Sequence, residues 1–147
     1  MSNDLPWYTD RYTCAQDEVR KEADGTYRFY SRSYSLLTGR EGEMDRDFIC
    51  SNWEPGKCAI EFIWQGYSLG AQLMVDTDYE NYEIRYSSAS FAGVPYMEAV
   101  WVGARQPFEE GTPEYEAWYD MVTQKMAEKL PSVPMVDLGY IKHTPDC

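Results

Sequence analysis

The sequence predicts a single all-β domain made of short antiparallel strands, followed by one late α-helix. Aromatic residues favour pleated, half-buried surfaces, and they make up 16% of the chain, with 13 Tyr and 5 Trp. Turn residues recur at short intervals along most of the chain, and the apolar period changes to the helical value after Thr112. The 147 residues fit one domain with one core, expected to span residues 1–147.

Turn signals separate the expected strands. Asp24-Gly25 suits a tight hairpin turn that needs positive φ, and further turn residues stand at 38–42 and 54–57. The segments expected as strands are 14–23, 26–37, 43–51, 58–64, 73–75, 82–88 and 99–105. Seven or so strands at this spacing indicate either a β-sandwich or an up-and-down barrel.

The late helix begins at Thr112-Pro113, because Thr can cap a helix and Pro is tolerated in its first turn. Apolar residues follow at helical spacing as far as Leu130, and Pro131 ends the pattern. The polar side carries both signs of charge, which favours packing on the strands over lying on a membrane. Residues 135–142 are expected to form one last strand.

The formal charge of −12 argues against several partners. A phosphate-binding surface needs clustered Lys and Arg, so nucleic acid is not expected, and neither is adsorption to anionic membranes. No run approaches the ~18–20 apolar residues of a membrane span. Association into a homo-oligomer is compatible with these features.

Four cysteines, an even number without CxxC spacing, favour two disulfides over a zinc site. Cys50 and Cys58 flank the 54–57 turn about symmetrically and could bridge adjacent strands. Disulfides indicate an oxidising compartment, so we expect a secreted protein. No basic-then-apolar leader follows Met1, which indicates either a mature chain with an added Met or a cytosolic protein.

Four segments, taken in order, resemble the lipocalin family. Residues 76–82, Asp-Thr-Asp-Tyr-Glu-Asn-Tyr, resemble its second signature, in the form found in the apolipoprotein D branch with the bacterial lipocalins and crustacean carotenoid carriers. Residues 101–107 resemble the third signature, which ends in Arg and Pro. Residues 54–57 with Ile60 and Phe62 resemble a turn and strand of the family, and residues 140–142 with Cys147 resemble its C-terminal strand and closing cysteine.

The resemblance implies an eight-stranded up-and-down antiparallel barrel with the helix packed on its wall. It also implies a disulfide from Cys14 to Cys147, which leaves Cys50 and Cys58 as the second pair. Trp7-Tyr8 resembles the first signature but lacks its Gly, and only six residues separate Trp7 from Cys14. Either the loop that covers the barrel mouth is short, or Trp7 is not the Trp of the signature. Arg105 is expected to pack on Trp7, as the corresponding Arg does in the family.

A barrel of this size can hold one small ligand. The resemblance implies a carrier of a carotenoid, bilin, retinoid or fatty acid, with no cofactor required and a carotenoid or bilin as candidate chromophore. Strand parity assigns the ligand-binding wall to Tyr27, Phe29, Ile60, Phe62, Trp64, Leu73, Val75, Ile84, Tyr86 and Trp101. Two alternatives remain: a sequestering protein for a cationic amine, with Asp17 or Glu18 as counter-charge, and an interaction module with a filled barrel.

No catalytic or metal site is expected. His143 is the single histidine and lies in the C-terminal tail, so a Ser–His or Cys–His arrangement in the barrel has no partner. One enzyme of the family, a prostaglandin isomerase, works through a free thiol inside the barrel. That reading would return if Cys58 were unpaired.

Overall fold

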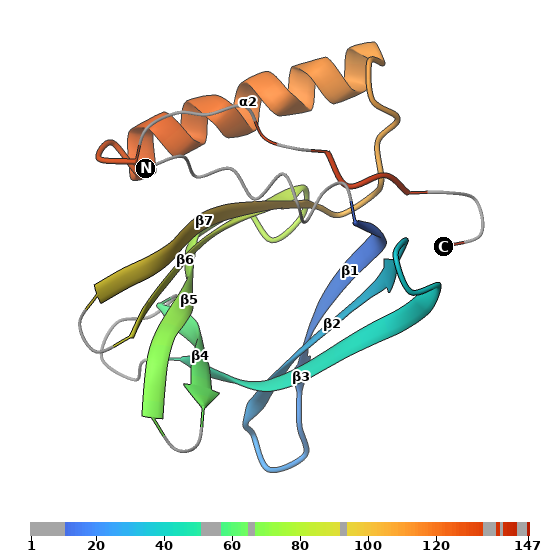
Figure 1. The fold of residues 1–147 in the computed structure, drawn as a ribbon. Helices are drawn as coiled ribbons and strands as arrows, with labels where there is room; N and C mark the ends of the chain where they lie inside the picture. The colour runs from blue at the N-terminus through green and yellow to red at the C-terminus, as the bar shows by residue number, and fades with distance from the viewer. Residues whose placement is uncertain are drawn as a thin grey trace.

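In the computed structural model, seven antiparallel strands form one sheet in sequence order and curl into a half-barrel, with helix α2 across one side (Figure 1). The strands are β1 (Tyr12–Lys21), β2 (Tyr27–Ser35), β3 (Arg40–Cys50), β4 (Cys58–Trp64), β5 (Tyr67–Thr77), β6 (Tyr82–Phe91) and β7 (Val94–Ala104), and the helix is Pro113–Lys129. The structure describes residues 11–50, 57–64, 67–91, 94–133, 138, 140–143 and 147, without the side chains of 62–64, 67–69, 91 and 95–97.

The hairpin turns form where turn chemistry predicts them. Gly25 adopts a φ of +89° in the β1–β2 turn, where Thr26 donates its backbone N–H to Asp24 Oδ1 over 2.9 Å. In the β5–β6 turn, Asp78 Oδ1 accepts the backbone N–H groups of Asn81 and Tyr82 at 2.7 and 3.1 Å. These hydrogen bonds hold the pKa of the Asp78 carboxyl well below its usual range.

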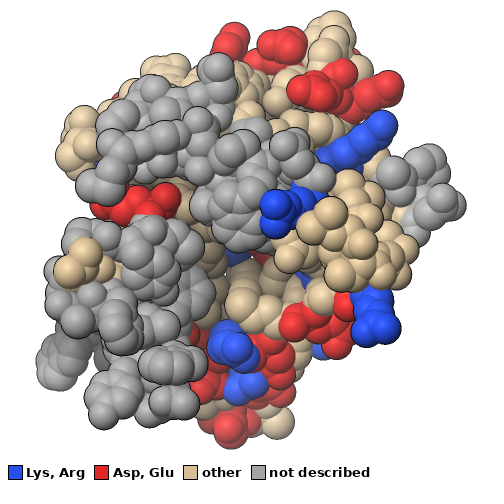
Figure 2. All heavy atoms as spheres, in the orientation of Figure 1, with Lys and Arg blue, Asp and Glu red and all other residues tan. Residues whose placement is uncertain are grey.

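The helix has the predicted start. Thr112 is its N-cap, and its Oγ1 accepts the backbone N–H of Tyr115 over 3.3 Å. Glu114 and Glu116 lie in the first turn and Lys129 lies in the last, which complements the helix dipole. Figure 2 shows Asp and Glu side chains gathered over this upper part of the molecule.

Two apolar clusters lie on opposite faces of the sheet. On the convex face, Tyr82 and Ile84 of β6 pack against Val122 and Met126 of α2. On the concave face, Phe29, Phe48 and Ile60 from three strands pack together. The sheet therefore buries apolar side chains on both faces, against α2 on the convex face and inside its own curl on the concave face.

The expectation of an eighth strand is wrong, because the described residues of the segment 135–142 do not form a strand. Cys14 donates its backbone N–H to Lys142 O over 3.1 Å, and His143 Nε2 lies 2.9 Å from Ala15 O. The tail therefore runs beside β1 without a regular ladder. The reason is local: Cys14 has a φ of +57° within a register shift of β1, which interrupts the row of β1 groups that a further strand would pair with.

Both predicted disulfides are confirmed. Cys14 is bonded to Cys147, and their Cα atoms are 5.3 Å apart. Cys50 is bonded to Cys58, and their Cα atoms are 4.0 Å apart. Cys50 and Cys58 are also direct cross-strand partners on β3 and β4. The first bond ties the C-terminal tail to β1, and the second ties together the two strands beside the 51–57 connection.

The two disulfides should differ in their effect on stability. The first closes a separation of 133 residues and the second a separation of 8. In the chain-entropy model they contribute about 5 and about 2.5 kcal/mol respectively. In urea denaturation, the free energy of unfolding should therefore fall further for Cys14→Ser/Cys147→Ser than for Cys50→Ser/Cys58→Ser. An equal or reversed loss would show that the terminal bond is strained or that the unfolded chain is already compact.

Candidate binding site inside the curled sheet

The concave face of the sheet is organised around Arg85 of β6. Its side chain is only 7% exposed, and its Nη2 forms an ion pair with Asp17 of β1. Its Nη1 donates to Gln72 Oε1 of β5 over 3.2 Å, and its guanidinium carbon lies 5.0 Å from the centre of the Phe29 ring on β2. A buried charge needs such partners, and here they come from three other strands.

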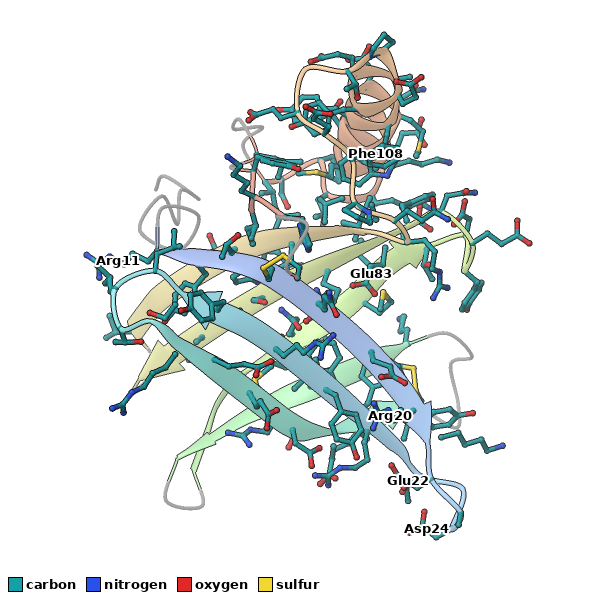
Figure 3. All side chains as sticks on the ribbon, turned by 90° about the vertical axis from the view of Figure 1, so that its right-hand side faces the viewer. Arg11, Arg20, Glu22, Asp24, Glu83 and Phe108 are labelled. Carbon is teal, nitrogen blue, oxygen red and sulfur yellow. A yellow bond between two sulfur atoms is a disulfide. The ribbon has the colours of Figure 1, made fainter. Side chains whose placement is uncertain are left out.

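Glu83 is the second carboxylate beside Arg85. Its Oε1 lies 3.1 Å from Arg85 Nε, but the Nε–H bond does not point towards that oxygen, so the contact is an ion pair and not a hydrogen bond. Arg85 Nε is therefore a buried donor without a hydrogen-bond partner among the described residues. Burial raises the pKa of the Glu83 carboxyl, and the neighbouring Arg85 opposes this only in part. Figure 3 shows Glu83 on the side of the sheet away from the helix.

Glycine at position 103 makes room for Glu83. Gly103 of β7 is the direct cross-strand partner of Glu83, and a Cβ atom there would lie 2.9 Å from both Cγ and Oε1 of Glu83. A larger residue would push the carboxylate away from Arg85.

A second set of hydrogen bonds continues from Arg85 along the same face. Gln72 Nε2 and Trp101 Nε1 both donate to Ser87 Oγ over 2.9 Å. Ser87 is fully buried, Gln72 is buried and Trp101 is half-buried. The concave face thus carries a connected polar row beside its apolar cluster, in which Gln72, Ser87 and Trp101 are hydrogen-bonded and only Arg85 Nε is a buried donor without a partner among the described residues.

Six of the ten predicted wall residues fall into three groups. Phe29 and Ile60 are fully buried on the concave face, and the Trp101 indole lies on the same face through its bond to Ser87. Tyr27 is 37% exposed, with Lys21 Nζ 5.9 Å from its ring centre. Phe62 and Trp64 belong to β4, and their side chains lie outside the described residues.

The structure corrects four of the residues assigned to the inner wall, because they lie on the convex face. Val75 and Ile84 pack against the helix cluster on the convex face. Leu73 is 45% exposed, and Tyr86 is its direct cross-strand partner, so both belong to that face as well. The strand-parity argument took the apolar side of β6 for the interior. The helix buries that side, so the polar side faces inward.

Glu83, Arg85, Gln72 and Ser87 are the interior residues that the sequence argument missed. For Glu83, Arg85 and Ser87 the available signal is the polar half of the alternation on β6, opposite the assigned wall residues Ile84 and Tyr86, whereas Gln72 lies on β5. Asp17 lies inward, as the amine hypothesis required, but Arg85 already binds its carboxylate. Glu18 faces away and pairs with Arg20 over 2.6 Å.

One end of the half-barrel is open. Residues of the β1–β2 turn, of the first part of β2 and of β3, including Tyr27, Phe48 and Cys50, line a depression of about 990 Å3 that is broadly open to solvent. Arg28, which also lines the depression, forms two ion pairs: its Nη2 lies 2.7 Å from Asp45 Oδ1, and its Nη1 lies 2.5 Å from Asp47 Oδ1. In Figure 2 the lower part of the molecule accordingly shows both signs of charge side by side.

The expected contact of Arg105 with Trp7 falls on a residue outside the described part of the chain. Arg105 itself donates from Nη2 to Tyr79 O over 2.5 Å and from its backbone N–H to Asn81 O over 3.2 Å. It therefore fastens the end of β7 to the β5–β6 turn.

Two further features concern partners. Across the described residues, no cluster of three or more His, Cys, Asp or Glu is arranged to hold a metal ion. None of the helices described is both long and apolar enough to cross a bilayer.

Glu83 should make stability depend on pH. Its folded-state pKa is raised above the ordinary 4.5, so the folded protein binds more protons than the unfolded chain, and stability falls as pH rises through this range. Glu83→Gln, which stays neutral, should melt at a higher temperature than wild type at pH 7, and the difference should shrink towards pH 4. Glu61→Gln, at an exposed carboxylate of β4, is the control. A lower melting temperature for Glu83→Gln at pH 7 would contradict the argument.

The sequence is 36% identical to apolipoprotein D of Bos taurus over 107 residues, which cover 71% of this chain. The chain spans about half the length of that curated relative, 54%. Among solved structures, apocrustacyanin C1 superposes with a TM-score of 0.61 at 12% identity, over 97% of this chain and 73% of that one. Apocrustacyanin C2 gives a TM-score of 0.53 at 12% identity, over 83% and 64%. No protein-family model matches the sequence. The relationship to apolipoprotein D, together with the shared fold, shows that the chain belongs to the lipocalin family.

Proposed function

We propose that this lipocalin is a secreted carrier that holds a small hydrophobic ligand against the concave face of its sheet. The observation that carries the proposal is the composition of that face. Aromatic and aliphatic side chains (Phe29, Phe48, Ile60, Trp101) lie there beside a few fixed polar groups. Ligand sites of carriers have this composition, because apolar surface supplies affinity and a few polar groups supply orientation.

Binding without chemistry is the reading that the side chains support. Both ring nitrogens of His143 lie beside backbone oxygens, Nδ1 at 3.1 Å from Ile141 O and Nε2 at 2.9 Å from Ala15 O. All four cysteines are in disulfides, so the thiol required by the isomerase reading is absent. Burial of an apolar ligand at about 25 cal/mol per Å2 is a sufficient driving force, and no reactive group is required.

Carotenoids, bilins, retinoids and fatty acids are the ligand classes that we propose. The resemblance to the crustacean carotenoid carriers and the aromatic side chains of the concave face favour a flat or conjugated molecule. Two disulfides in so short a chain support an extracellular location.

Trp101→Ala should weaken ligand binding roughly tenfold or more, because one indole against a ligand contributes on the order of 1–3 kcal/mol. Leu73→Ala is the matched control, since Leu73 lies on the convex face and is 45% exposed. It should change neither affinity nor melting temperature. Tryptophan-fluorescence quenching by a carotenoid, biliverdin, retinol and a fatty acid measures the binding, beside thermal melts.

A filled barrel would behave differently in the same measurements. No ligand would quench the wild-type protein, and Trp101→Ala would cost about 3–5 kcal/mol of stability through the cavity that it leaves. That pair of results would refute the carrier function. If Leu73→Ala weakened binding as much as Trp101→Ala, the ligand would lie on the convex face instead.

A further inference from the structure

Building on the proposed carrier function, we propose that the groups around Arg85 select an uncharged ligand with an acceptor oxygen, a carbonyl or a hydroxyl, over carboxylates and amines. The inference rests on the geometry of four interior side chains: Asp17, Glu83, Arg85 and Trp101.

The unmet group in the interior is a hydrogen-bond donor. Only 7% of the Arg85 side chain is exposed, and its Nε has no hydrogen-bond partner. Its Nη2 and Nη1 are already engaged by Asp17 and Gln72. A buried donor left unpaired is costly, so an oxygen that approaches Nε in line gains a full hydrogen bond to a charged group. This requirement is for an acceptor, and an ammonium group has none to offer.

The local charge disfavours an anionic ligand. Two carboxylates, Asp17 and Glu83, face the single guanidinium of Arg85. A ligand carboxylate would bring a third negative charge into a poorly solvated space, where charges interact more strongly than in water. An uncharged oxygen accepts from Nε without this repulsion.

Glu83 is the side chain that has to move for such an oxygen to reach Nε. Glu83 is 25% exposed, and within the described part of the chain its side chain is held only by the misaligned contact with Nε, so it can turn aside when a better acceptor arrives. Trp101 is the direct cross-strand partner of Arg85 on β7. An apolar, conjugated body attached to the oxygen would therefore lie beside the Trp101 indole.

The inference divides the proposed ligand classes. Fatty acids and bilins carry carboxylates and are disfavoured, as is retinoic acid. Retinoid alcohols or esters and carotenoids with keto groups are favoured over carotenoids that are pure hydrocarbons.

Two matched ligand pairs test this by fluorescence quenching at pH 7.4. Methyl retinoate and retinoic acid share a skeleton and a carbonyl but differ by one negative charge. Canthaxanthin and β-carotene share a polyene but differ by two keto oxygens. Canthaxanthin should bind about tenfold or more tightly than β-carotene, because a hydrogen bond to a charged donor is among the stronger kinds. Methyl retinoate should bind about tenfold or more tightly than retinoic acid, because the acid adds a third negative charge beside Asp17 and Glu83.

Two variants assign the selectivity to the cluster. Arg85→Lys keeps the positive charge and removes Nε, so canthaxanthin should lose its advantage over β-carotene. Glu83→Gln removes one negative charge at nearly constant shape. It should tighten retinoic acid by about tenfold or more while methyl retinoate changes little. The Glu83 variant keeps the test decisive even if Arg85→Lys fails to fold.

The outcomes separate the inference from the carrier function. Retinoic acid binding as tightly as its ester, or β-carotene as tightly as canthaxanthin, overturns the inference and leaves the carrier function standing. Unchanged retinoic acid affinity in Glu83→Gln also overturns it. Failure of all four ligands to bind the wild-type protein overturns the inference, and the carrier function falls with it only if biliverdin and a fatty acid also fail to bind.

Discussion

The ion pair between Arg85 and Asp17 is the interaction on which the rest of the structure depends. In the described residues, hydrogen-bonded pairing runs only between neighbouring strands from β1 to β7, so the sheet is curled without a ladder joining its two edges. The pair reaches from β6 to β1 across that gap. A guanidinium buried in a space of low dielectric has to stay paired, and this requirement holds the edge strand over the interior. The Cys14–Cys147 bond ties the C-terminal residue to the same strand.

The chemistry of the interior follows from the position of the helix. Because α2 packs on the convex face, it buries the apolar residues of β6, Tyr82 and Ile84, and leaves Glu83, Arg85 and Ser87 to face inward. A strand that is apolar on one side and polar on the other usually turns its apolar side to the core. Here the sheet has two covered faces, and the polar side forms a connected hydrogen-bonded row with Gln72 and Trp101. The interior therefore combines apolar surface with fixed hydrogen-bonding groups, as the proposed carrier function requires.

Local features were predictable because local chemistry decides them. The Asp24-Gly25 turn needs positive φ, the Thr112 cap and Pro113 start the helix, and Cys50 and Cys58 flank one hairpin. The Cys14–Cys147 bond is a long-range contact, and only the resemblance to the lipocalins predicted it. The expected eighth strand failed for a reason of backbone shape, since positive φ at Cys14 interrupts the edge with which it would pair.

By itself, the sequence determined the strand and turn order, the late helix and the periodicity of each strand. Alternation with a period of two separates the two sides of a strand, but it does not say which side faces the interior. Ile84 and Arg85 show this directly, because both are buried and they lie on opposite faces. Only the tertiary structure decided that the helix covers the first and that Asp17, 68 positions away in sequence, neutralises the second. The physical reason is that a buried charge requires a partner in space, and sequence separation places no restriction on where that partner lies.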